Sequence, residues 1–373
     1  MSTHFSGRIV TADGITASDM TVTDGVITHI HPREDTGDLP LIVPGYTDIH
    51  NHGGAGESFP TSDLDGCRKA ARFHARNGTT SMLASLVSAT ENVLLKQTEI
   101  LADLTEEGEI LGIHLEGPFV NICKCGAQDP AAIIPGDPDM LERIADRGRG
   151  HIRSITFAPE TANARALVDI CAERNIIVSL GHTDADSTTC WDIISYALER
   201  GATITATHLF NAMPQIHHRN PGAATALLDA ATQGLVTVEL VADGVHLDDD
   251  IVNMVRNAAP RHAMFITDAM AAAGLGDGSY ILGALPVTVD NKVARLTEGG
   301  AIAGGTSVLH DQLQRHLRCG WELEDMIPLL TTNAATLLGT NAGALEVGKD
   351  ANFIIMSDTL TISEVYRLGN LIT

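Results

Sequence analysis

Short runs of apolar and β-branched residues alternate with longer segments of helical periodicity through the middle of the chain. The runs have the length and residue types of buried strands, and the segments between them, such as residues 64–76 and 164–174, repeat apolar residues at helical spacing. An α/β chain in which strand and helix alternate eight times is typical of a (β/α)8 TIM barrel. The predicted strands cover residues 41–50, 79–86, 110–116, 152–158, 176–181, 203–208, 235–241 and 263–268.

The two ends of the chain have a different pattern. Residues 5–31 consist of short alternating stretches joined by turns, with a hairpin signal at Asp24-Gly25, and the last part of the chain again has strand character. We therefore predict that residues 1–43 and 344–373 pair into a small β-sandwich domain, and that residues 44–343 form the barrel.

A further pair of alternating stretches follows the eighth predicted strand. Residues 285–289 and 292–296 flank an Asp290-Asn291 turn signal. This pattern predicts a β-hairpin inserted in the barrel near residues 280–300.

Composition and charge restrict the class of protein. The chain has 373 residues, of which 44% are hydrophobic, so it can bury a large core. Its formal net charge of -23 repels polyanions, which argues against nucleic acid and anionic membranes as partners. No apolar run reaches the ~18 residues of a membrane span, and the first residues lack the pattern of a signal peptide, so we expect a cytoplasmic protein.

The six cysteines are scattered along the chain, which is typical of free thiols in an intracellular protein rather than of a disulfide framework. Cys123 and Cys125 lie close together, but no second pair could complete a four-ligand zinc site with them.

Ionisable side chains gather at the ends of the predicted strands, which form one face of a barrel. His50 and His52 end the first strand, and because residues two apart on a strand point the same way, both imidazoles can bind one metal ion. They could instead be surface histidines beside the glycine-rich residues 53–56. The other strands that end in such residues contribute Glu116, His182, His208 and Asp268.

Each of these residues alone could be a satisfied polar residue, but together they favour a metal centre. A buried acid such as Glu116 needs a cation or a set of hydrogen bonds. A divalent ion held by imidazoles and one carboxylate lowers the pKa of a bound water toward ~7, so the expected chemistry is hydrolysis, with Asp268 as the base. Motifs for a serine nucleophile, a phosphate loop or a dinucleotide are absent. We expect zinc, with iron, manganese or cobalt as alternatives.

A basic loop follows His208 directly. Residues 211–222 contain Arg219 and two histidines, a rare basic concentration in this acidic chain. The loop could bind a phosphate or a carboxylate, with Arg219 as the main donor, or it could be a solvated surface loop. His246 follows the seventh predicted strand on the same face and is a candidate substrate contact.

Longer motifs surround these residues, at positions 44–53, 114–119, 181–183, 208–213, 242–246 and 267–269. On these motifs, the sequence resembles over nearly its whole length the N-acetylglucosamine-6-phosphate deacetylase family of the metal-dependent amidohydrolase superfamily. The resemblance implies that the principal metal ion is bound by Glu116, His182 and His208. It also implies that Asp268 is the catalytic acid and base, and that the histidine pair of the first strand supports a second ion in some members, so that one or two ions bind per subunit.

The resemblance further implies an amino-sugar phosphate as the substrate. The implied reaction is hydrolysis of the N-acetyl group of N-acetylglucosamine 6-phosphate, which gives glucosamine 6-phosphate and acetate. Arg219 and His246 correspond to phosphate contacts that reach across the interface of a homodimer into the neighbouring site. The remaining implied substrate contacts are Asn211, Ala212, Ile302, Ala303 and Gly304.

One loop departs from the family pattern. The family usually has a histidine that touches the sugar in the flexible loop after Glu116, and this chain has Gln128 there. Glutamine can donate a hydrogen bond but does not titrate near neutrality, so we expect Gln128 to contact substrate without transferring protons.

Two alternatives stay open at this stage. The chain could be another amidohydrolase, such as an N-acyl amino-acid deacylase or a cyclic-amide hydrolase, or an inactive protein that binds a metal or a sugar phosphate. Several two-metal members of the superfamily bridge their ions with a modified lysine on the fourth strand, and residues 152–158 contain no lysine. Retention of Asp268 with the whole candidate ligand set argues against a mere binding protein.

Overall fold

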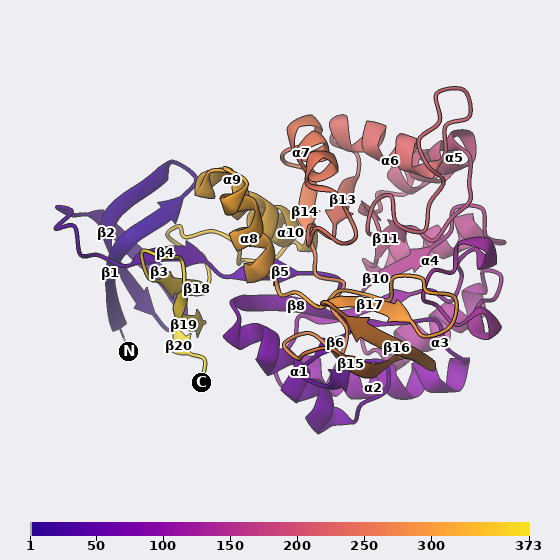
Figure 1. Cartoon of the computed structure of the whole chain (residues 1–373), viewed down its shortest axis with the longest axis horizontal. Helices are drawn as coiled ribbons and strands as arrows, with labels where there is room; N and C mark the ends of the chain where they lie inside the picture. Colours follow the sequence, from indigo (N-terminus) through magenta and orange to yellow (C-terminus); the bar gives the residue numbers. More distant parts are fainter. Residues whose placement is uncertain (1) are drawn as a thin grey trace. The chain divides into compact units, whose positions relative to one another are not determined.

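The computed structural model describes residues 2–373, and within them a parallel sheet of eight strands alternates with helices (Figure 1). Neighbouring strands in this sheet follow one another in the sequence, as expected when each pair is joined by a helical crossover. The predicted (β/α)8 barrel is therefore confirmed. Its strands are β5 (Tyr46–Asp48), β8 (Thr79–Leu86), β9 (Gly112–Glu116), β10 (Ile152–Phe157), β11 (Ile177–Leu180), β12 (Ile204–Ala206), β13 (Thr237–Leu240) and β14 (Ala263–Phe265).

The first seven helices connect successive barrel strands, and several of them begin at capping residues that the sequence supplies. At the start of α3, for example, the Asp137 side chain accepts a hydrogen bond from the backbone N–H of Met140, and Pro138 occupies the first turn. The helices are α1 (Leu64–Arg76), α2 (Glu91–Glu106), α3 (Pro138–Arg147), α4 (Ala164–Arg174), α5 (Ser187–Glu199), α6 (Ala223–Thr232), α7 (Asp249–Ala258), α8 (Leu309–Arg318), α9 (Leu323–Leu330) and α10 (Thr332–Leu338).

The barrel closes just beyond the ends of β5 and β14. The backbone N–H of Asp268 donates to the carbonyl of His50 at 2.9 Å, and the N–H of His52 donates to the carbonyl of Ala269 at 2.7 Å. Asn51 and Ala269 form a parallel bridge between these hydrogen bonds. Closure therefore brings residues from the two ends of the barrel sequence into direct contact.

The first predicted strand is two strands in the structure. β4 (Leu41–Pro44) joins the terminal sheet, and β5 begins the barrel after Gly45. A side chain at position 45 would meet the Thr80 hydroxyl at 2.2 Å, so the chain crosses between the two sheets at a residue without a Cβ. Hydrophobicity alone did not reveal this division, because both strands are buried.

The chain termini form a separate mixed sheet, as predicted for the small β domain. β4 pairs with an N-terminal strand on one side and a C-terminal strand on the other, and the Asp24-Gly25 hairpin turn has both residues at positive φ. Backbone bonds from Ala351 to Gly25 and from Ile27 to Lys349 fold the sheet over a core that includes Ile9 and Phe353. The sheet order is β20 (Asn370–Leu371), β19 (Ile362–Arg367), β18 (Phe353–Met356), β4, β1 (Ser2–Thr11), β2 (Gly14–Thr23) and β3 (Val26–Pro32).

The insertion after β14 is an antiparallel sheet of β15 (Gly278–Leu282), β16 (Leu285–Asp290) and β17 (Val293–Leu296). The predicted hairpin corresponds to β16 and β17, and the additional strand β15 pairs with β16. Sequence analysis missed β15 because four of its five residues are at least partly exposed and it has no strict alternation. Two short strands, β6 (Gly53–Gly54) and β7 (Glu57–Ser58), pair after the first barrel strand.

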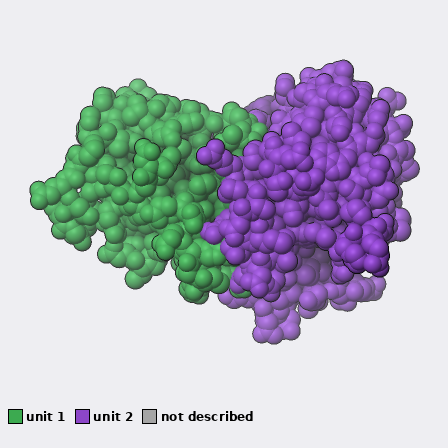
Figure 2. Space-filling model, turned by 90° about the horizontal axis from the view of Figure 1, so that it is seen from above, with its two compact units in different colours: residues 1–48, 72–82, 308–373 green, residues 49–71, 83–307 purple. Residues whose placement is uncertain are grey.

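Contacts within the chain define two compact units, which Figure 2 colours separately. One unit contains the chain up to Asp48 together with Arg72–Met82 and Val308–Thr373, and the other contains Ile49–Ala71 and Leu83–Ser307. All the candidate site residues belong to the second unit. No helix in residues 2–373 has the length and apolar character needed to cross a membrane.

Candidate metal centre and active site

The candidate ligands stand at the carboxyl ends of the barrel strands. Glu116 is the last residue of β9, and His182 and His208 follow β11 and β12 by two residues. His182, His208 and Asp268 have positive φ values of 47°, 28° and 47°. Such conformations are costly for residues with a Cβ and persist where the surrounding structure imposes them, which occurs most often at functional sites.

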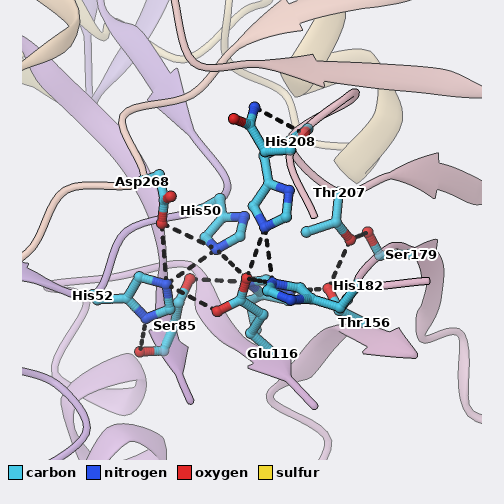
Figure 3. Close-up of polar contacts among 12 residues, drawn as sticks. His50, His52, Ser85, Glu116, Thr156, Ser179, His182, Thr207, His208 and Asp268 are labelled. Carbon is cyan, nitrogen blue, oxygen red and sulfur yellow. Dashed lines mark hydrogen bonds and ion pairs between the residues drawn. The ribbon is translucent and has the colours of Figure 1, made fainter. Parts of the chain in front are cut away.

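Two groups of ligand atoms share the carboxylate of Glu116 (Figure 3). In the first group, Oε1 of Glu116 lies 2.9 Å from Nε2 of His182 and 3.0 Å from Nε2 of His208. In the second group, Oε2 lies 3.3 Å from Nε2 of His52, and Nε2 of His50 lies 3.1 Å from Nε2 of His52. All the predicted metal ligands are thus brought together, and all are at least 96% buried.

The other ring nitrogens determine which face of each imidazole is free to bind a cation. Nδ1 of His182 lies 2.8 Å from the carbonyl of Lys124, and Nδ1 of His52 lies 3.2 Å from the carbonyl of Ser85. Nδ1 of His50 lies 3.1 Å from Glu239. Because a carbonyl or carboxylate oxygen can only accept, each of these Nδ1 atoms carries a proton, and in the neutral ring the Nε2 atom presents a lone pair.

The cluster therefore fits a divalent cation. Nε2 of His50 lies 3.1 Å from Nε2 of His52, and Nε2 of His182 lies 3.0 Å from Nε2 of His208, with a carboxylate between the two pairs. Such acceptors repel one another unless a cation lies among them, and imidazole with carboxylate is a donor set typical of zinc and related metals. The acceptors behind His50, His52 and His182 are the outer partners that metal-binding histidines usually have.

Charge in the site is set by competition between burial and neighbouring groups. Burial opposes ionisation of Glu116, but the adjacent histidines, with His50 foremost, hold the pKa of its carboxyl well below the usual range. Burial likewise opposes a charge on His50, and Glu116 overcomes it and raises the His50 pKa. The carboxylate remains ionised at neutral pH and is available to a cation.

Asp268 lies against the second ligand group. Its Oδ1 is 3.2 Å from Nε2 of His52 and 3.5 Å from Nε2 of His50. Burial alone would raise the pKa of the Asp268 carboxyl, but a hydrogen bond from the protonated ring of His52 and the charge of a protonated His50 hold it below its usual range. An ionised carboxylate beside a metal centre can accept a proton from water.

A cavity of about 250 Å³ opens above the ligands. Its wall contains Glu116, His182 and Asp268 from the metal region and Leu282 from the inserted sheet. The predicted substrate residues that line it are Gln128, Asn211, Ala212, His246, Ile302 and Gly304.

Two predicted substrate contacts do not line this cavity. Ala303 is fully buried in an apolar cluster with residues of the inserted sheet, because the chain alternates sides between Ile302 and Gly304. Arg219 is exposed on its loop, where its guanidinium lies 2.7 Å from Nε2 of His218.

His246 differs from its expected placement. We expected it to complete the site of a neighbouring subunit, but it lines the cavity of its own chain, with Nε2 3.8 Å from Asp268. Its Nδ1 is held at 2.9 Å by Asp243, which raises the His246 pKa against the effect of burial.

Sequence analysis missed Glu239, which supports two ligands. Its carboxylate lies 3.1 Å from Nδ1 of His50 and accepts from the backbone N–H of His208 at 3.1 Å, and the residue is only 1% exposed. The signal was present, because Glu239 is a single carboxylate within the otherwise uncharged residues 235–241. The carbonyls of Ser85 and Lys124, which hold His52 and His182, carry no signal in the sequence.

Comparison with known proteins places this geometry in context. A model of the Amidohydrolase family matches residues 41–372. N-acetylglucosamine-6-phosphate deacetylase of Bacillus subtilis is 35% identical over 357 residues, which cover 89% of this chain and 84% of that protein.

Solved structures of N-acetylglucosamine-6-phosphate deacetylases are also similar to this chain. A mutant of N-acetyl-D-glucosamine-6-phosphate deacetylase from Mycobacterium smegmatis, in complex with N-acetyl-D-glucosamine-6-phosphate, has a TM-score of 0.92 at 31% identity, covering 100% of this chain and 99% of that chain. The corresponding enzyme of Thermotoga maritima has a TM-score of 0.89 at 27% identity, with coverage of 100% and 99%.

Proposed function

The chain belongs to the amidohydrolase family, and we propose that it hydrolyses the acetamide of N-acetylglucosamine 6-phosphate, releasing acetate and glucosamine 6-phosphate. The observation that carries this proposal is the convergence of two imidazole pairs on Glu116, with Asp268 beside them at the floor of a cavity. This arrangement has the parts that metal-assisted amide hydrolysis needs: a cation site, a base and space for a substrate.

The proposed metal is zinc, with iron, manganese or cobalt as alternatives, and one or two ions bind per subunit. Glu116, His182 and His208 would hold the principal ion, and His50 and His52 would hold a second ion that shares Glu116. A divalent cation in this position supplies a Lewis acid, which acidifies water and polarises the carbonyl of the amide.

Asp268 is the proposed acid and base. Hydrolysis requires that a proton leave the attacking water and that a proton reach the amine as the C–N bond breaks. The Asp268 carboxylate can do both in turn, because it is ionised at neutral pH and one of its oxygens lies 3.2 Å from Nε2 of His52, beside the ligand group. The other oxygen faces His246 at 3.8 Å.

The cavity is the proposed binding site for the amino sugar, with contacts from Gln128, His246 and the backbone near Ala212. Arg219 is the proposed phosphate donor and would act in the site of a second subunit of a homodimer. Support for this role is that Arg219 is exposed and lies outside the lining of its own cavity. We also propose a cytoplasmic location, since the six cysteines are all free thiols, which is typical of proteins in a reducing compartment.

Acetate release provides the direct test. Purified protein would be assayed on N-acetylglucosamine 6-phosphate, its C4 epimer, unphosphorylated N-acetylglucosamine, an N-acetyl amino acid and a cyclic amide, alongside elemental analysis of bound metal. We expect the highest kcat/KM on a phosphorylated amino sugar and at least one tightly bound divalent ion. Faster hydrolysis of the acyl amino acid or the cyclic amide would favour another amidohydrolase activity. A protein without bound metal would refute the proposed chemistry.

A further inference from the structure

The loop between β9 and α3 lies on the wall of the cavity and is tied to the residues around His182. The backbone N–H of Asn121 donates to the carbonyl of His182 at 2.9 Å. The side-chain amide of Asn121 donates to Glu160 at 2.8 Å. Lys124 pairs with Asp184 at 3.3 Å, and its carbonyl accepts from His182. These contacts fix the start of the loop beside one candidate metal ligand.

Gln128 closes the same loop from the other side. It is 3% exposed, and its Oε1 accepts a hydrogen bond of 2.6 Å from the backbone N–H of Ser88. Because a backbone N–H can only donate, this contact assigns the oxygen of the amide and leaves its nitrogen to point the other way. That nitrogen, Nε2, donates to Oε2 of Glu116.

The two oxygens of Glu116 consequently have different partners. Oε1 faces Nε2 of His182 and of His208, whereas Oε2 receives the amide of Gln128 and lies near His52. A carboxylate held by one oxygen cannot rotate freely about its terminal bond, so the hydrogen bond from Gln128 keeps Oε1 directed at the two histidines.

We propose that Gln128 is a positioning residue of the metal centre, which orients Glu116 toward His182 and His208 in addition to lining the cavity. The amide bridges a backbone N–H and a carboxylate, and it keeps both bonds over the working pH range because it does not titrate. Outer partners of metal ligands affect metal affinity by about 10 to 100-fold. This inference rests on the proposed function only in taking Glu116 as a metal ligand.

The test measures metal affinity in the absence of substrate. Wild-type protein and a Gln128→Met variant, which keeps the length of the side chain without its donor, would be titrated with Zn²⁺ against a chromogenic chelator. We expect the Kd of the tightest ion to rise by about 10 to 100-fold in the variant. At saturating Zn²⁺, kcat should recover more completely than at limiting Zn²⁺, because the lost function is ligand orientation.

Two further variants complete the experiment, one as a second test of the amide and one as a control. Gln128→Asn keeps an amide but is too short to bridge Ser88 and Glu116, so it should also weaken the metal. Ser88→Ala is the matched control, because the Ser88 hydroxyl is buried without a hydrogen-bond partner while its backbone N–H, the actual donor, is retained. Circular dichroism would verify that each variant is folded.

The outcomes separate this inference from the proposed function. If the Gln128 variants bind Zn²⁺ as tightly as wild type and only KM rises, Gln128 contacts the substrate alone and the inference is wrong. If wild-type protein binds no divalent ion, the metal-dependent function itself fails.

Discussion

The strand ends of the barrel and the loop of residues 214–221 use the same kinds of side chain but hold them differently. At the strand ends, His50 and His52 are at most 1% exposed, and Nδ1 of each ring faces a buried acceptor. In the loop, His217 and His218 stack with ring centroids 4.8 Å apart, and Arg219 contacts His218, while all three remain exposed. One region is assembled without a ligand, and the other keeps its donors exposed to solvent.

This difference indicates which region is suited to the reaction and which is suited to substrate recognition. A preorganised, buried cluster is typical of groups that act on the reacting atoms, because reorganisation during the reaction would cost free energy. Exposed donors on a loop are typical of recognition, since loops tolerate adjustment to a partner. Changes at the strand ends should therefore affect every substrate equally, whereas changes in the loop should depend on whether the substrate carries a phosphate.

The largest effect is expected for Glu116→Ala, because Glu116 is shared by both ligand groups. We expect the variant to lose tight metal binding, measured by elemental analysis after dialysis. Its kcat should fall by more than the ~10² to 10⁴-fold that loss of an acid and base alone would cause. The exposed variant Glu107→Ala is a control for general effects of removing a glutamate. A metal content equal to wild type would show that Glu116 is not a principal ligand.

Asp268→Asn should follow, with kcat reduced by ~10² to 10⁴-fold on phosphorylated and unphosphorylated substrates alike. The amide preserves the shape of the side chain but cannot accept and return a proton, so the metal content should remain that of wild type. Steady-state kinetics and elemental analysis would be measured together, with the exposed variant Asp290→Asn as control. If more than about a tenth of kcat survived, another residue would have to be the base.

Arg219→Ala tests the loop. A hydrogen bond to a charged group contributes about 1.5 to 3 kcal/mol, which corresponds to about 10 to 150-fold in kcat/KM for the phosphorylated substrate. The activity on unphosphorylated N-acetylglucosamine should barely change. Equal losses on both substrates would indicate that Arg219 supports the structure of the loop.

Subunit mixing would locate the site that Arg219 serves. Hybrid dimers of the Arg219→Ala and Asp268→Asn proteins should regain activity if the arginine acts in the neighbouring subunit, because one of their two sites then contains both wild-type residues. No recovery after verified exchange would place Arg219 in its own site.

The smallest effect is expected for Glu239→Gln, which keeps an acceptor for His50 but removes the charge behind it. Loss of an outer partner lowers metal affinity by about 10-fold at the lower end of the usual range. Zinc titration should show a larger loss of affinity for the ion at His50 and His52 than for the ion at His182 and His208. The reason is that Glu239 contacts the ring of His50 but only the backbone of His208. Unchanged affinity for both ions would show that the charge of Glu239 does not tune the centre.

Much of the architecture was predictable because its signals are local. Periodicity identified the alternating strands and helices, and the ends of β9, β11 and β12 identified Glu116, His182 and His208 as neighbours on one face. The Asp24-Gly25 turn was predictable because a two-residue hairpin requires positive φ values that these residues adopt readily.

Other features depended on close approach between segments far apart in the sequence. Gly45 divides two strands because Thr80 leaves no room for a side chain, and β15 forms because β16 supplies its hydrogen bonds. His246 faces its own cavity because Asp243 holds its ring beside Asp268. No periodic pattern or motif in the sequence predicts these contacts.

The sequence by itself determined which residues could form the centre, because strand periodicity and strand ends depend on residues within a few positions of one another. Only the tertiary structure decided how each ring is oriented. The tautomers of His50, His52 and His182 depend on Glu239, Ser85 and Lys124. The orientation of Glu116 likewise depends on an amide twelve positions later. These assignments need hydrogen-bond partners at about 3 Å, and only barrel closure and loop packing bring such distant atoms together.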